Sequence, residues 1–306
     1  MKKVFSLLLI FLLLPLFAQN PKRPQFLANQ FIPEEIKTFF KFYPDIKYTV
    51  FFDDKLFDWK IDMTADLFFE RTKKPKGQKS VTLYWAGGRL LPKEELPNKE
   101  NYWILQYNYE NKLRDPKTFT PEEIDRIKNF SSSENRKNSG GTPMFFFDWL
   151  YSAQSQRIIE EHIIRTTFLG KKTRIHERIY DPIKNVEKKI LAKKDNPEIK
   201  AFLSALKSAD AYHWREIAET SRKSFHSYGI AIDLLPKRLN GRAIYWGWEK
   251  ERSGEKWMLV PLEKRWMPPA EIRKIFESEG FIWGGYWIIF DNMHFEYHPE
   301  LVKISN

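Results

Sequence analysis

The stretch that most constrains this chain is Ser224–Asp233, which reads Ser-Phe-His-Ser-Tyr-Gly-Ile-Ala-Ile-Asp. After Gly229 the apolar residues alternate with the period of a strand, which places Asp233 on the face opposite the core. A carboxylate on an otherwise apolar strand is costly unless it is paired or binds a metal. His226 lies seven residues before Asp233, so we expect it on the loop before the strand, with Gly229 permitting the turn. These residues alone fit either a metal site or a salt-bridged acid beside an unrelated histidine.

A second cluster near the C-terminus favours the metal site. The chain reads Trp-Gly-Gly-Tyr-Trp at 283–287 and Asp-Asn-Met-His-Phe-Glu at 291–296. His226, Asp233 and His294 together offer two imidazoles and a carboxylate, which are ligands suited to zinc. Three protein ligands leave a fourth position for water, the pattern of a catalytic site and not of a closed structural one. Asp291, three residues before His294, is a candidate for the base that accepts a proton from this water.

The two motifs resemble those of the VanY-type D-alanyl-D-alanine carboxypeptidase family of zinc metallopeptidases, which includes L-alanyl-D-glutamate endolysins. The resemblance covers about residues 212–301, and every position of Ser-x-His-x-x-Gly-x-Ala-x-Asp is filled. It implies that His226, Asp233 and His294 bind Zn²⁺ and that Asp291 is the catalytic base. It also implies that Arg215, in the context Trp-Arg-Glu-Ile, polarises the substrate carbonyl.

The resemblance implies an activity as well: hydrolysis of peptidoglycan stem-peptide bonds that involve D-amino acids. The bond is cut either by a D,D-carboxypeptidase or by an L-alanyl-D-glutamate endopeptidase. A carboxypeptidase needs a cation for the terminal carboxylate, and Arg222 and Lys223 are candidates. The alternative from another class is a non-catalytic peptidoglycan-binding protein on a degenerate peptidase fold. Such a protein would be free to lose Asp291 or Arg215, and both are present.

Three other side chains near the motifs have rival interpretations. His298 lies four residues after His294 and is a second candidate ligand. Glu296 shares a strand face with His294, so it either orients that ligand from behind or is a solvated acid. Ser224 is more readily a hydrogen-bonding residue of the loop than a nucleophile, because no base is placed to activate it.

The N-terminus has the pattern of a secretory signal. Two lysines precede an almost entirely apolar run from Val4 to Ala18, which is too short to span a bilayer comfortably. We therefore expect a signal peptide at residues 1–18, a mature protein exported to the periplasm or cell envelope, and no stable membrane insertion after its removal. An uncleaved anchor is the alternative. The absence of cysteine excludes disulfides and a lipoprotein anchor.

The formal net charge of +11 falls to +9 when the two lysines of the signal are removed. This charge favours anionic polymers such as cell wall. No nucleic-acid partner is expected, because an exported protein is separated from the nucleic acids of the cell. The basic residues are also spread among acidic ones and do not form a cluster. The pattern does not predict the oligomeric state.

We expect an α+β fold, in which helices pack on a small, mainly antiparallel sheet like the core of VanY and hedgehog-like zinc peptidases. Residues 19–143 are expected to form an N-terminal extension or module with strands, ending in a linker or long surface loop at 131–143. Residues 144–306 are expected to form the zinc peptidase domain. Further expectations are strands at 47–52, 80–85, 102–109 and 281–290, helices at 148–170, 181–194, 197–208 and 268–279, and a hairpin at 244–261.

Overall fold

The computed structural model describes residues 32–69 and 74–302, so the expected signal peptide at 1–18 lies outside the described residues. The chain is α+β, as expected, with small antiparallel sheets and helices packed on them. Within the described part, no helix is long and apolar enough to span a membrane.

The first third of the chain builds a four-stranded antiparallel sheet in the order β1-β2-β3-β4. Tyr102–Tyr109, expected as a strand, is not one; Tyr102 forms a single bridge with Gly141. The elements of this part are α2 (Glu34–Lys41), β1 (Ile46–Asp53), β2 (Asp58–Phe69), β3 (Lys74–Trp85), β4 (Leu90–Leu91) and the 3-10 helix η1 (Lys93–Asn101).

A helical segment then leads into the second sheet. Thr120 caps α3 in a capping box with Glu123. The elements that follow are α3 (Pro121–Phe130), α4 (Ser133–Asn138), α5 (Phe145–Leu150), α6 (Gln156–Ile159), β5 (Ile163–Phe168), β6 (Lys171–His176), α7 (Tyr180–Ala192), α8 (Pro197–Ala205) and β7 (Leu206–Asp210).

The second four-stranded sheet has the order β7-β8-β10-β9 and is antiparallel throughout. Helix α10 packs on it, where the rings of Phe276 and Phe295 stack with centroids 3.9 Å apart. The elements of this last part are η5 (Phe225–Tyr228), β8 (Ala231–Pro236), α9 (Trp246–Ser253), η6 (Gly254–Leu259), α10 (Ala270–Ser278), β9 (Phe281–Trp283), η8 (Gly284–Tyr286) and β10 (His294–Tyr297).

Three further expectations for local structure were wrong. The helix expected at 148–170 is replaced by α5, α6 and the β5–β6 hairpin, whose turn residues Leu169 and Gly170 both have positive φ, of 48° and 74°. Two consecutive positive φ values suit the twist of a two-residue hairpin turn. The hairpin expected at 244–261 is instead α9 followed by η6, and the strand expected at 281–290 ends at Trp283.

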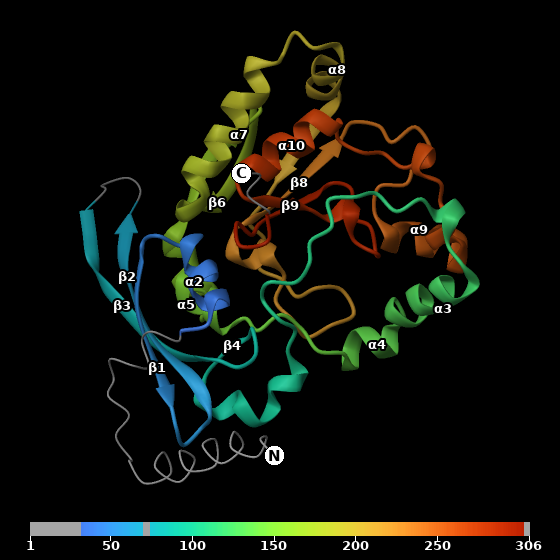
Figure 1. Cartoon of the computed structure of the whole chain (residues 1–306). Coiled ribbons are helices and arrows are strands. Elements are labelled where there is room, and N and C mark those ends of the chain that lie inside the picture. Colours follow the sequence, from blue (N-terminus) through green and yellow to red (C-terminus); the bar gives the residue numbers. More distant parts are fainter. Residues whose placement is uncertain (1–31, 70–73, 303–306) are drawn as a thin grey trace, which may run out of the picture.

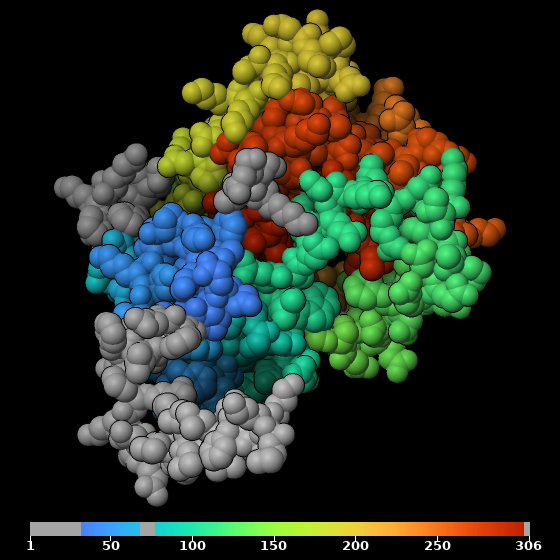
Figure 2. Space-filling view, in the orientation of Figure 1, coloured from blue at the N-terminus to red at the C-terminus, as the bar shows by residue number. Residues whose placement is uncertain are grey.

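The N-terminal part packs directly on the C-terminal part, and buried residues of both belong to one hydrophobic core. Phe39 of α2 contacts Phe146 of α5, with ring centroids 5.1 Å apart, and these two helices lie next to each other in Figure 1. The Lys79 ammonium donates hydrogen bonds to the Leu150 carbonyl and the Ser152 hydroxyl, each at 2.8 Å. In Figure 2 the segment between η1 and α3 crosses the face of the molecule, with C-terminal residues visible on both sides of it.

Candidate metal centre and groove

Strands β8 and β10 bring Asp233 and His294 together, because they are direct partners in the antiparallel register. Ile232 and Leu234 are fully buried, so the alternation along β8 turns Asp233 to the other face, as the sequence predicts. The two side chains meet with Asp233 Oδ1 2.8 Å from His294 Nδ1.

His226 reaches the same point from η5, the turn that precedes β8. Gly229 ends this turn with a left-handed φ of 66°, and a Cβ there would lie 2.8 Å from the backbone nitrogen of His176. Glycine is therefore required at this position both for its φ and for the close approach of β6. The Ser224 hydroxyl accepts a hydrogen bond from the His226 backbone N–H at 3.3 Å, so this serine fixes the loop.

Hydrogen bonds to the outer nitrogen of each imidazole orient both rings. His226 Nδ1 lies 2.5 Å from the carbonyl oxygen of Ala211, which can only accept, so Nδ1 carries the proton and Nε2 presents a lone pair. His294 Nε2 lies 2.8 Å from Glu296 Oε1, which leaves His294 Nδ1 facing Asp233 and His226.

Ligand atoms of His226, Asp233 and His294 all lie within 4.8 Å of one another. His226 Nε2 is 3.1 Å from His294 Nδ1 and 3.2 Å from Asp233 Oδ2. Burial lowers the pKa of His294, but its hydrogen bonds to Asp233 and Glu296 outweigh this and raise the pKa well above its usual value. Burial raises the pKa of Asp233, whereas the two imidazoles bring it below its usual value. Two imidazoles and a carboxylate that converge in this way fit a divalent cation such as zinc, which would take the place of the proton that His294 holds between its two acidic partners.

A chain of buried polar side chains continues outward from His294. His298 lies between Glu296 and Glu300, with 2.8 Å from its Nδ1 to Glu300 Oε1, and so it is not in the ligand cluster. Burial lowers the pKa of His298, but the two glutamates raise it to about 9. Glu300 accepts a hydrogen bond of 2.6 Å from the hydroxyl of Tyr43, at the end of α2. The N-terminal part of the chain therefore contributes Tyr43, the last residue in the series of hydrogen-bonded side chains that begins at His294.

Asp291 has a carboxylate with one buried oxygen that the described part of the protein leaves without a partner. Its Oδ1 atom is buried and has no hydrogen-bond partner among the described residues. Burial raises the pKa of Asp291 to about 7. The positive charge of His294 opposes this rise, whereas the like charge of Asp233 adds to it. A carboxylate with a free oxygen and a raised pKa is suited to accepting a proton.

Arg215 is held through its backbone, while its side chain lines the groove described below. The Ser227 hydroxyl accepts from the Arg215 N–H at 2.8 Å and donates to its carbonyl at 2.7 Å. Ser227 therefore couples Arg215 to the η5 turn that carries His226, a role for which we found no signal in the sequence.

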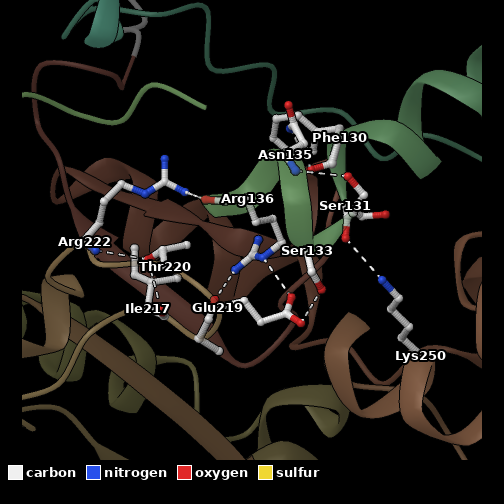
Figure 3. Close-up of polar contacts among 12 residues, drawn as sticks. Phe130, Ser131, Ser133, Asn135, Arg136, Ile217, Glu219, Thr220, Arg222 and Lys250 are labelled. Carbon is white, nitrogen blue, oxygen red and sulfur yellow. Dashed lines mark hydrogen bonds and ion pairs between the residues drawn. The ribbon is translucent and has the colours of Figure 1, made fainter. Parts of the chain in front are cut away.

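The loop that follows Arg215 is braced by α4, which lies in the segment expected to be a linker or surface loop (Figure 3). The buried Arg136 donates to the Ala218 carbonyl at 2.8 Å and lies 3.4 Å from the Glu219 carboxylate. Arg222 donates to the Gly140 carbonyl at 2.6 Å, and its guanidinium lies over the ring of Trp103. Lys223 forms an ion pair with Asp148. The two cations that we nominated for a terminal carboxylate are therefore engaged by the protein.

A groove of about 1080 Å³ is lined by His226, Asp233 and Arg215 together with β5, β6, α7 and the segment 210–213. His213 is exposed in this groove. His176 is only 2 % exposed and packs behind Gly229. The Nδ1 atom of His162 lies 2.6 Å from Glu177 Oε1.

Comparison with known families agrees with this placement over part of the chain. Residues 218–297 match a family model described as D-alanyl-D-alanine carboxypeptidase. This match supports the peptidase family and includes His226, Asp233, Asp291 and His294, whereas Arg215 lies just before it. Residues 35–106 match a domain of unknown function. Neither the curated proteins nor the solved structures contain a match to this chain.

Proposed function

We propose that this protein is a zinc-dependent peptidase that hydrolyses peptidoglycan stem-peptide bonds involving D-amino acids. The observation that carries the proposal is the convergence of His226, Asp233 and His294 beside the unpartnered carboxylate oxygen of Asp291. The family match over residues 218–297 supports the peptidase class, and the adjoining groove has room for a short peptide.

In this proposal His226, Asp233 and His294 hold the zinc. When bound, zinc supplies Lewis-acid chemistry, which lowers the pKa of water toward about 7 and polarises a carbonyl. The Ala211 carbonyl and Glu296 keep the proton on the outer nitrogen of each imidazole, so that the inner nitrogens remain free to bind the ion.

The protein's own groups then move the proton and stabilise charge. Asp291 accepts a proton at Oδ1 from the attacking water and returns it to the leaving amine. Arg215 donates to the substrate oxygen as negative charge develops on it; one such donor is typically worth about 3–4 kcal/mol of barrier. The groove holds the peptide so that the scissile carbonyl faces these groups.

The proposed function predicts stereospecific hydrolysis. Two synthetic stem peptides that differ only in D- or L-alanine at the scissile bond should be cleaved at very different rates, with the D-containing peptide preferred. The masses of the products identify the bond, and so separate the D,D-carboxypeptidase from the L-alanyl-D-glutamate endopeptidase. Binding of both peptides without any product would contradict the proposal and favour the non-catalytic binding protein.

We also propose that the protein is exported and that residues 144–306 form the peptidase unit, supported at its outer network by Tyr43 of the N-terminal extension. Export predicts a mature N-terminus near Gln19, because the apolar run ends at Ala18. Sequencing the N-terminus of protein from an exporting host measures this. An intact Met1 on protein that stays in the cytoplasm would contradict it.

A further inference from the structure

One wall of the groove carries cations that the catalytic proposal does not use. Arg165 of β5 and Lys172 and Arg174 of β6 line the groove and are exposed. None of the three forms an ion pair with another residue in the described part of the chain. Each therefore offers a full positive charge and free N–H donors to whatever enters the groove.

Two of these cations repel each other in the protein without a ligand. Arg165 and Arg174 are direct partners across the β5–β6 hairpin, and like charges directly opposite destabilise a strand pair. The Arg174 guanidinium lies 4.9 Å from the centre of the Tyr212 ring. Stacking holds the guanidinium plane while leaving its N–H edge available for a planar anion such as a carboxylate. An anion between the two arginines would relieve their repulsion.

The other charged residues of the groove do not neutralise the positive charge of these three cations. Lys184 is neutralised by Glu187, 2.7 Å away, and donates to the Thr167 carbonyl. The acids of the groove are Asp233, a member of the ligand cluster, and Asp210, its partner on β7. The two acids thus occur together at the proposed metal, while the three unpaired cations occur on the hairpin.

We propose that the β5–β6 hairpin is a carboxylate-binding wall that selects acidic peptides. The substrate segment that lies along it carries a free carboxylate, which Arg165, Lys172 and Arg174 bind. This inference rests on the proposed function and adds to it a preference for peptides with a free acid over the same peptides with an amide. The ligand is the substrate itself, because the hairpin lines one groove together with His226 and Asp233, two of the proposed metal ligands.

The test uses two peptides that are identical except that one acidic side chain carries either a carboxylate or a carboxamide. With the parent protein, kcat/KM for the acid should exceed that for the amide by about 10-fold, mainly through a lower KM. A change of about 10-fold is at the lower end of the effect expected for a hydrogen bond to a charged group. In the double variant Arg165→Gln/Arg174→Gln this ratio should fall to about 1. Added salt should lower kcat/KM for the acid more than for the amide.

Lys207→Gln is the matched control, because Lys207 is an exposed cation of β7 that does not line the groove. It should keep the parent's preference. An equal kcat/KM for acid and amide with the parent protein would overturn the proposal while leaving the peptidase function intact.

Binding measured by calorimetry keeps the inference testable apart from hydrolysis. If neither peptide is cleaved but the acid binds more tightly than the amide, and the double variant loses this difference, the carboxylate wall stands and the peptidase proposal fails. If inorganic polyphosphate binds to the hairpin while acid and amide peptides bind equally, the wall serves a polyanion and the inference is overturned.

Discussion

Replacing His294 with alanine should remove nearly all zinc, whereas the parent protein should contain one zinc per chain. His294 Nδ1 faces both Asp233 and His226, so its loss leaves two ligands where catalytic zinc sites use three. His226→Ala should have the same effect. Elemental analysis of the folded, monodisperse fraction measures the metal content. A second measurement is the midpoint of thermal unfolding, which added zinc should raise in the parent and not in either variant.

His213→Ala is the control for zinc content. His213 is an exposed imidazole of the same groove that lies outside the ligand cluster, so this variant should bind zinc like the parent. Stoichiometric zinc in folded His226→Ala or His294→Ala would refute the assignment of the ligands.

Replacing Asp291 with asparagine should lower turnover by about 10²–10⁴-fold, the usual contribution of a positioned general base. Asparagine keeps the size of the side chain but cannot accept the proton. Zinc content should stay at the parent value, because Asp291 is not among the clustered ligands. Burial raises the pKa of Asp291 to about 7, so its ionised form is disfavoured in the fold at neutral pH. The asparagine variant should therefore be at least as stable as the parent.

Asp125→Asn, at an exposed position of α3, is the matched control and should change neither turnover nor stability. If Asp291 instead has a structural role, Asp291→Asn should lose stability and keep its activity per folded molecule. Parent-like turnover by folded, zinc-loaded Asp291→Asn would show that another group is the base.

The centre of the site could be predicted from sequence because it depends on local patterns. The alternation after Gly229 indicated which face of β8 carries Asp233, and the structure confirms it. The odd spacing from His226 placed that residue on the preceding turn, which is η5. Of the two interpretations that the sequence left open for Glu296, the structure shows the one in which it contacts His294, with 2.8 Å from its Oε1 to His294 Nε2.

The parts that sequence did not predict depend on tertiary contacts. Ile163–Phe168 contains apolar residues that also fit a helix, and only pairing with Lys171–His176 decides for strands. The basic wall of the groove was therefore missed. Tyr43 lies 257 positions from Glu300, and no local pattern links them. Tyr228 and Trp283, aromatic residues of the two motifs, are fully buried in the core, which only the tertiary fold decides.

The most direct test of the account is a zinc titration of metal-free protein with hydrolysis of a stem peptide as the readout. Chelation should abolish hydrolysis. Added zinc should restore it in proportion, with a plateau at one zinc per chain and products whose masses sum to that of the substrate plus one water. Hydrolysis that survives complete removal of the metal, or no hydrolysis by folded protein loaded with one zinc, would contradict it.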